Sequence, residues 1–193
     1  GEHAVVYGYK GITIPLPQMT VDVELKETNI IQERDEIISF ISDVCGINDR
    51  TEININSTIP VGRGLGSSAA LSIAIARAKK LTNIREIADK CEKFIHGNPS
   101  GIDVNQVLSD TPLLFSKKDG AIPLNFNLDS YLLIIDTGVI GITKETLKHI
   151  KQNFENYKSY IDELGEITEK VIEPLKKKAI EVVGSYMYKA HDL

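Results

Sequence analysis

The stretch that decides the fold of this 193-residue chain is Pro60-Val61-Gly62-Arg63-Gly64-Leu65-Gly66-Ser67-Ser68-Ala69-Ala70, a glycine-rich loop that runs directly into a helix. Glycines at alternate positions allow backbone angles that a side chain would forbid, and they let a ligand approach the main chain closely. The first N–H groups of a helix have no partner within it, and the positive end of its dipole points outward. The stretch therefore predicts an anion site of the kind that binds phosphate. The hydroxyls of Ser67 and Ser68 could donate to phosphate or ligate Mg²⁺.

The helix that follows, expected over Ser67–Lys80, is apolar nearly all round, which predicts that it is buried. Its charged residues, Arg77, Lys79 and Lys80, all stand at the C-terminal end, where they offset the negative end of the dipole. A buried helix with an uncompensated positive start favours an anion. The alternative interpretation is a plain glycine-rich turn with a serine as the helix N-cap.

The loop matches neither of the two common phosphate-binding patterns. A P-loop needs a lysine before the serine, and none precedes Ser67 or Ser68. In the dinucleotide pattern G-x-G-x-x-G the third glycine would come one residue later, and an acidic residue would end a strand roughly 20 residues on. The sequence therefore predicts a phosphate loop of another class.

Outward from the loop, hydrophobic periodicity predicts an α+β chain in which strands and helices mix up to about Asp136 and only helices follow. Strands are expected at Ala4–Tyr7, Gly11–Leu16, Thr20–Lys26, Glu52–Thr58, Leu113–Phe115 and Tyr131–Asp136, the last of them buried. Helices are expected at Asp35–Cys45, Ser67–Lys80 and Ile84–Ile95, from the loop after Gly101 to about Leu108, and from Thr143 onward with breaks near Asn156 and at Pro174. Asn83 with Glu86 resembles a capping box at the start of one helix.

Composition excludes several classes of protein. Hydrophobic residues make up 42% of the chain and charged residues 25%, which is ordinary for a folded domain. The 22 basic and 27 acidic residues give a net charge of −5, so no overall attraction to nucleic acid or to an anionic membrane is expected. No apolar run approaches the roughly 18–20 residues that span a bilayer. Two cysteines far apart, Cys45 and Cys91, indicate neither a disulfide framework nor a metal knuckle and weakly favour the reducing cytoplasm.

Two carboxylates follow the loop in the sequence. Glu92 lies late in the predicted helix Ile84–Ile95, about 80° from Ile84 at roughly 100° per residue, on the margin of the apolar stripe. A carboxylate turned toward the core from there would need a cation, and Mg²⁺ is a natural one. The alternative is a solvated glutamate at the edge of the helix.

Asp103 ends the segment His96-Gly97-Asn98-Pro99-Ser100-Gly101-Ile102-Asp103. Ser100 and Asp103 together form an S-x-x-D capping arrangement, which is the structural interpretation. A carboxylate held at a helix start is also kept ionised and oriented, as a base that accepts a hydroxyl proton must be. Thr143 is most simply a helix N-cap, although it could present its hydroxyl to a ligand.

The histidines carry no comparable signal. His3 follows Glu2 in a turn-rich start, and the spacing of His96, His149 and His191 does not favour a zinc site. Nothing in the sequence ties Ser67 or Ser68 to a basic partner for nucleophilic catalysis.

Taken together, the motifs resemble those of the GHMP small-molecule kinases and, within them, the mevalonate kinases of the bacterial type. The run Gly1-Glu2-His3-Ala4-Val5-Val6-Tyr7-Gly8 is similar to the first motif of that family, Pro60–Ala70 to its phosphate loop, and His96–Asp103 to the segment with the catalytic aspartate. Asp136-Thr137-Gly138 leading to Thr143-Lys144 is a weaker match.

The resemblance implies the GHMP kinase fold, with an N-terminal domain like domain 2 of ribosomal protein S5 at residues 1–128 and the helical start of a ferredoxin-like domain at 129–193. It also implies ATP-dependent phosphorylation of the C5 hydroxyl of mevalonate in the cytoplasm, and it leaves a homodimer open. The implied roles are ATP binding by Gly62, Gly64, Leu65, Gly66, Ser67, Ser68 and Ala69, Mg²⁺ binding by Ser68 and Glu92, base catalysis by Asp103, and mevalonate binding by Glu2, His3 and Thr143.

The chain also departs from the pattern of this family. Relatives carry a lysine-bearing strand before the Gly1–Gly8 run and a second glycine-rich loop in a later domain, so we expect a fragment with impaired turnover. The segment between Ser68 and Glu92 is shorter by about two helical turns of ~3.6 residues, and Ile142 replaces a polar residue. The alternatives are another GHMP kinase, acting on phosphomevalonate, homoserine or a sugar, and a non-catalytic nucleotide-binding module.

Overall fold

A computed structural model of the chain describes residues 2–127, 129–138 and 149–193, without the side chains of Glu2 and His3. These residues form two compact units, one of Leu16–Val107 and the other of Gly1–Pro15 with Leu108–Leu193. The units divide at other points than the expected domain boundary between residues 128 and 129, and that two-domain division stays a prediction. None of the described helices is long and apolar enough to cross a membrane.

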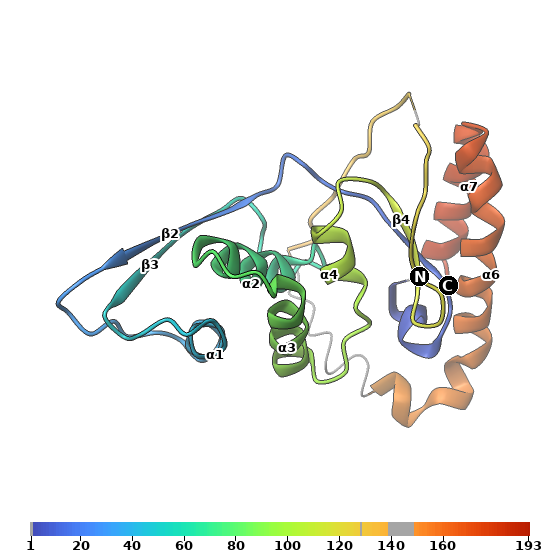
Figure 1. Ribbon diagram of the computed structural model, residues 1–193. Coiled ribbons are helices and arrows are strands. Elements are labelled where there is room, and N and C mark those ends of the chain that lie inside the picture. The colour runs from blue at the N-terminus through green and yellow to red at the C-terminus, as the bar shows by residue number, and fades with distance from the viewer. Residues whose placement is uncertain (1, 128, 139–148) are drawn as a thin grey trace. The chain divides into compact units, whose positions relative to one another are not determined.

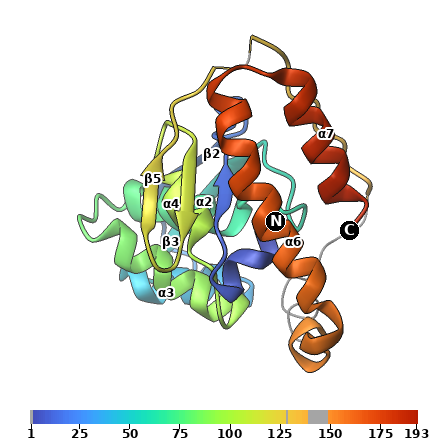
Figure 2. The same cartoon turned by 90° about the vertical axis from the view of Figure 1, so that its right-hand side faces the viewer.

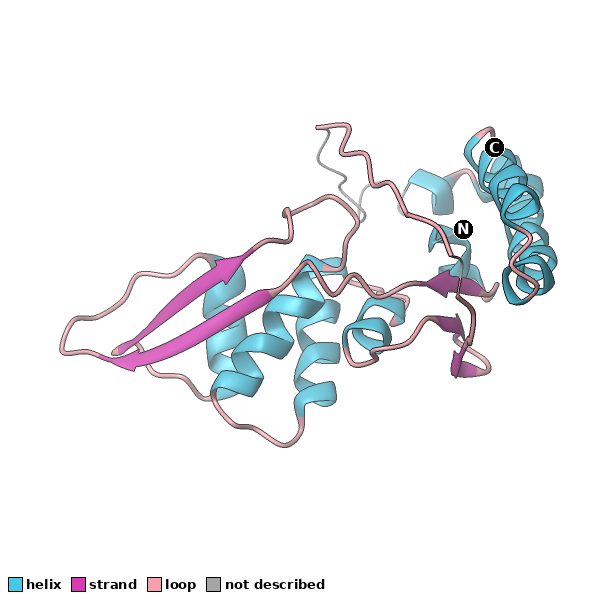
Figure 3. Ribbon diagram, turned by 90° about the horizontal axis from the view of Figure 1, so that it is seen from above, coloured by secondary structure: helices cyan, strands magenta, loops and turns pink. Residues whose placement is uncertain are grey.

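The unit Leu16–Val107 contains a two-stranded antiparallel sheet covered by helices on one face (Figures 1 and 3). Strands β2 (Val21–Glu27) and β3 (Thr51–Ser57) pair in a register that sets Val23 opposite Ile55 and Leu25 opposite Ile53. The helices are α1 (Glu36–Cys45), α2 (Ser67–Ala78), α3 (Ile84–His96) and α4 (Ile102–Val107). In β2 the apolar residues alternate with exposed charged ones, so the apolar side faces the helices.

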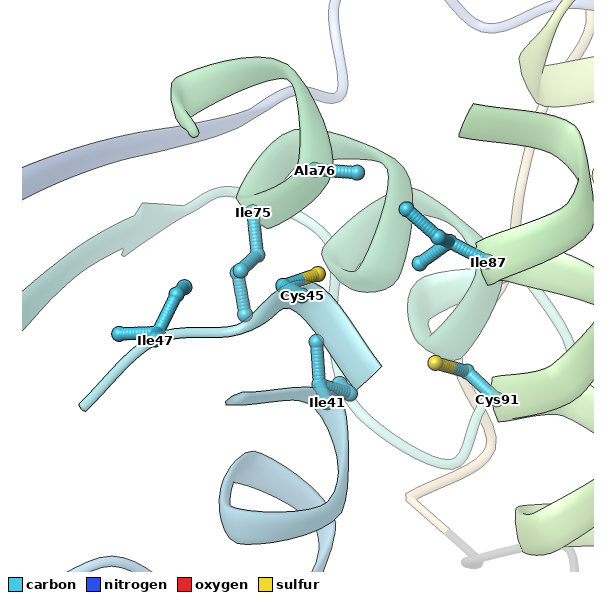
Figure 4. Packing of buried hydrophobic residues seen from close by; sticks show 7 residues of the cluster. All are labelled: Ile41, Cys45, Ile47, Ile75, Ala76, Ile87 and Cys91. Atoms are coloured by element: carbon cyan, nitrogen blue, oxygen red, sulfur yellow. The ribbon is translucent and has the colours of Figure 1, made fainter. Parts of the chain in front are cut away.

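The core of this unit lies where α1, α2 and α3 meet the sheet (Figure 4). Its buried members are Ile41, Cys45, Ile47, Ile75, Ala76, Ile87 and Cys91. Val23, Leu25 and Ile53 of the sheet pack against this cluster. Both cysteines are reduced, and burial raises the pKa of the Cys91 thiol to about 12. The thiol therefore stays protonated at neutral pH and acts as a small apolar side chain.

The second unit joins a three-stranded antiparallel sheet to a pair of long helices (Figure 2). The chain enters through a 3₁₀ helix, η1 (Glu2–Tyr7), and the sheet has the order β1 (Gly11–Thr13), β4 (Leu113–Ser116) and β5 (Gly120–Pro123). Helices α6 (Phe154–Lys176) and α7 (Ile180–His191) lie side by side. Leu124, Leu175 and Val183 form a small core there.

The periodic elements of the sequence are confirmed to within a few residues. They are β2, β3, β4, α1, α2, α3 and α4. Local chemistry explains some ends: Asp35 Oδ1 accepts a hydrogen bond from the Ile38 N–H at 2.8 Å, and α1 stops at Gly46 with a φ of 63°. The expected capping box at Asn83 is wrong, because its side chain makes no capping hydrogen bond to the helix backbone.

Two predicted strands are wrong. The segment Ala4–Tyr7 is part of η1, and only Gly11–Thr13 of the next predicted strand is extended. Tyr131–Asp136 is not a strand, and the side chains of Tyr131 and Leu133 are 104% and 80% exposed. A strand forms only where a partner strand satisfies its backbone groups, so an apolar run by itself does not make one.

The helical breaks were also misplaced. Helix α6 begins at Phe154 and continues through Asn156, and the turn lies at Asn153, three residues before the predicted break. Pro174 lies inside α6, near its end, and the helix stops at Lys176. The predicted start of this helix at Thr143 falls within residues 139–148, which lie outside the described part of the chain.

Candidate active site

The glycine-rich loop adopts the backbone conformation that its glycines permit. Gly62, Gly64 and Gly66 have φ angles of 72°, 69° and 67°, all in the left-handed region that a side chain makes costly. Gly66 is itself the N-cap of α2, and no side chain caps the first turn of this helix. The interpretation of a serine N-cap is therefore wrong, because the N-cap position is a glycine, which has no side chain to cap the helix.

Helix α2 has the buried, one-sided charge distribution that the sequence predicts. Ala69, Ile73 and Ala76 are at most 1% exposed. The first turn contains no acidic residue, and Arg77 lies in the last turn. No acidic residue of the helix itself offsets the positive end of its dipole at Gly66, which is a favourable environment for an anion.

Asp103 lies in the first turn of α4, beside this helix start. A side-chain carbon placed on Gly66 would lie 3.4 Å from Asp103 Oδ1. The turn before α4 is held by Ser100, whose hydroxyl oxygen accepts a hydrogen bond from the Ile102 N–H at 3.3 Å. The carboxylate therefore lies close to the glycine at the start of α2.

Glu92 is buried, with 2% of its surface exposed, so the interpretation of a solvated helix edge is wrong. Helix α3 packs against α2, and this contact covers the margin of the apolar stripe. The Oε1 atom of Glu92 is buried and has no hydrogen-bond partner. A carboxylate oxygen in that situation is costly unless a cation compensates it.

The Ser68 hydroxyl and the orphaned Glu92 oxygen fit a magnesium ion. Both are hard oxygen donors, and Mg²⁺ in proteins commonly takes one or two carboxylates and completes its shell with water and substrate phosphate. The described residues contain no cluster of three or more His, Cys, Asp or Glu side chains that could hold a metal by themselves. A metal here would thus depend on a phosphate ligand.

His96 also lies at this site, although it is not among the residues predicted from the sequence. Its Nε2 lies 3.1 Å from Ser68 Oγ and 3.6 Å from Glu92 Oε2. The sequence ties Ser68 to no basic partner, whereas the structure places the His96 ring beside it. The available signal was the four-residue spacing of Glu92 and His96, which places both on one face of α3. Because one nitrogen faces both partners, the group is not a nucleophilic triad, in which the acid and the nucleophile contact different ring nitrogens.

The structure thus brings together Gly66, Ser68, Glu92 and Asp103 within one compact unit. It does not test the expected substrate residues. The side chains of Glu2 and His3, and all of Thr143, lie outside the described part of the chain.

Comparison with known proteins shows which proteins this chain is similar to. Residues 29–109 match the family model of the GHMP kinases N-terminal domain, and the fold is that of the GHMP kinases. The crystal structure of L. major mevalonate kinase in complex with R-mevalonate superposes with a TM-score of 0.77 at 22% identity, covering 100% of this chain and 70% of that one.

The similar curated proteins are mevalonate kinases. That of Pyrococcus furiosus is 28% identical over 91% of this chain, and that of Pyrococcus horikoshii is 27% identical over 96%. The chain covers 65% and 66% of the length of these two relatives, slightly less than two thirds. The more specific resemblance to the bacterial type stays a prediction.

Proposed function

We propose that the protein containing this chain transfers the γ-phosphoryl group of ATP to the C5 hydroxyl of (R)-mevalonate. The observation that carries the proposal is the proximity of the glycine-rich start of α2 to the Asp103 carboxylate, whose Oδ1 lies 3.4 Å from a carbon placed on Gly66. The start of α2 is suited to bind a phosphate, and the Asp103 carboxylate is suited to accept a hydroxyl proton. The names of the similar proteins favour mevalonate as the acceptor.

In this proposal the residues Gly62–Ser68 and Ala69 surround the ATP phosphates. The left-handed glycines bring backbone N–H groups to the phosphate oxygens without side chains in between. Asp103 accepts the proton of the C5 hydroxyl of mevalonate, while the oxygen of that hydroxyl forms a bond to the γ-phosphorus of ATP. The bond between that phosphorus and the β–γ bridging oxygen breaks, and ADP leaves. Positioning and charge stabilisation supply most of the rate in such transfers.

Ser68 and Glu92 would hold Mg²⁺ beside the phosphates. When bound, the ion would neutralise charge on the phosphate oxygens. Glu92 is suited to this role because its Oε1 atom is buried without a hydrogen bond. Glu2, His3 and Thr143 are proposed to line the mevalonate pocket, on the basis of the resemblance alone.

The decisive test is a phosphorylation assay of the protein encoded by the complete reading frame that contains this chain. Purified protein is incubated with Mg²⁺, ATP and, separately, mevalonate, phosphomevalonate, homoserine or galactose, and ³¹P NMR follows the phosphate ester that forms. We expect a 5-phosphate of mevalonate and no product from the other acceptors.

The same assay separates the alternatives. Product from homoserine or galactose but not from mevalonate would assign a different GHMP kinase. ATP binding without transfer to any acceptor would indicate a non-catalytic nucleotide-binding module.

Gly66→Ala is expected to lower kcat/KM by about 10²-fold, because a methyl group in contact with Asp103 Oδ1 would fill space that the phosphate is proposed to use, and a misplacement of about 1 Å can cost this much. Gly46→Ala is the matched control. Its φ of 63° resembles the 67° of Gly66, and a methyl group there would meet nothing within 4 Å. Both variants should lose stability similarly, by about 1–2 kcal/mol. Equal losses of activity in the two variants would contradict the prediction.

A further inference from the structure

His96 joins the Ser68 hydroxyl to the Glu92 carboxylate. Ser68 stands in the first turn of α2, and Glu92 and His96 stand near the end of α3. The imidazole Nε2 lies 3.1 Å from Ser68 Oγ and 3.6 Å from Glu92 Oε2. The His96 side chain is 26% exposed and that of Glu92 3% exposed, so the ring stands between the buried carboxylate and solvent.

The contact distinguishes the two oxygens of Glu92. Oε2 faces the imidazole, whereas Oε1 is buried without any hydrogen-bond partner. Without a neighbour the carboxylate would turn about its last bond and its two oxygens would exchange places, since this torsion is broad. The Ser68 hydroxyl is likewise free to rotate unless a partner such as Nε2 fixes it.

We propose that His96 is a positioning residue for the divalent cation. Its Nε2 engages Ser68 Oγ and Glu92 Oε2, and it thereby leaves Glu92 Oε1 and the outer side of the serine hydroxyl for the ion. The inference rests on the proposed function, which places Mg²⁺ between these residues. Partners that orient metal ligands from outside the first shell commonly contribute 10–100-fold to metal affinity.

Manganese binding tests this role without turnover. The full chain, with the non-hydrolysable analogue AMP-PNP, is titrated with Mn²⁺, and EPR measures the free ion. His96→Ala should raise the dissociation constant of Mn²⁺ about 10–100-fold. His96→Gln should raise the dissociation constant less, because the glutamine amide can still form hydrogen bonds with Ser68 and Glu92. His149→Gln is the control, since His149 contacts the Tyr157 hydroxyl, and it should bind Mn²⁺ like the unmodified chain.

A second measurement separates positioning from a structural role. The affinity of the same variants for ADP is measured in EDTA, where no metal contributes, and this affinity should not change. An unchanged Mn²⁺ affinity in His96→Ala would overturn the proposal. So would a metal-free ADP affinity that falls as much as the Mn²⁺ affinity.

The experiment also distinguishes failure of the inference from failure of the proposed function. If the unmodified chain binds AMP-PNP but not Mn²⁺, the positioning role falls and the phosphate loop stands. If the unmodified chain binds neither, the proposed function falls together with the inference.

Discussion

Replacing Asp103 by asparagine should lower kcat about 10²–10⁴-fold, the range in which a positioned general base contributes. Asparagine has nearly the same shape but cannot accept the hydroxyl proton. Because Asp103 Oδ1 lies 3.4 Å from a carbon placed on Gly66, the substitution also removes a negative charge beside the phosphate site. Nucleotide affinity should therefore stay equal or rise. Steady-state kinetics with mevalonate, combined with calorimetric ATP binding, measure both quantities.

Asp89→Asn provides the control for Asp103→Asn. Asp89 is exposed on α3 in the same compact unit, so Asp89→Asn makes the same chemical change at the surface of the protein. This variant should keep the unmodified kcat. Retention of the full kcat by Asp103→Asn would show that another group accepts the proton.

Gly165→Ala should lower the free energy of unfolding of the second unit by about 1–3 kcal/mol, as at other overpacked sites. A carbon placed on Gly165 would lie 2.1 Å from Cδ1 of Tyr9, and 2.8 Å from both Cε1 and Cγ. Alanine within a helix otherwise gains about 1 kcal/mol over glycine, so the expected sign depends on this clash. The Tyr9 ring yields little, since its hydroxyl donates a hydrogen bond to Asp162.

Gly184→Ala is the matched control on the neighbouring helix α7. Nothing lies within 4 Å of a carbon placed there, so alanine should stabilise the helix by about 0.5–1 kcal/mol. Thermal unfolding followed by circular dichroism compares the two variants, and hydrogen exchange of the α6 amides locates the effect. The double variant Gly165→Ala/Tyr9→Ala should lose less free energy of unfolding than the two single variants lose together. Additive effects, or a stabilising Gly165→Ala, would contradict the contact.

Local chemistry made several parts of the fold predictable. The alternation of β2 and the one-sided charges of α2 are properties of neighbouring residues, so they can be read before any tertiary contact is known. Strand β5 was not predicted, because Gly120 and Pro123 at its ends weaken the local signal. The apolar run Tyr131–Ile135 gave the opposite error, since pairing with another strand is a non-local requirement.

The candidate site divides in the same way. The loop glycines, Ser68 and Asp103 stand in motifs that the sequence displays directly. His96 was missed because its contact with Ser68 spans 28 residues and depends on how α2 packs against α3. The expected substrate residues Glu2, His3 and Thr143 stay predictions.

The sequence by itself determined the glycine-rich start of α2 and the positions of two carboxylates along the chain, because glycine conformations and helix polarity are set within a few residues. Only the tertiary structure decided that Glu92 is buried, that His96 faces it, and that Asp103 lies beside Gly66. Burial and the meeting of side chains depend on the packing of separate helices, and no single stretch of sequence specifies that packing.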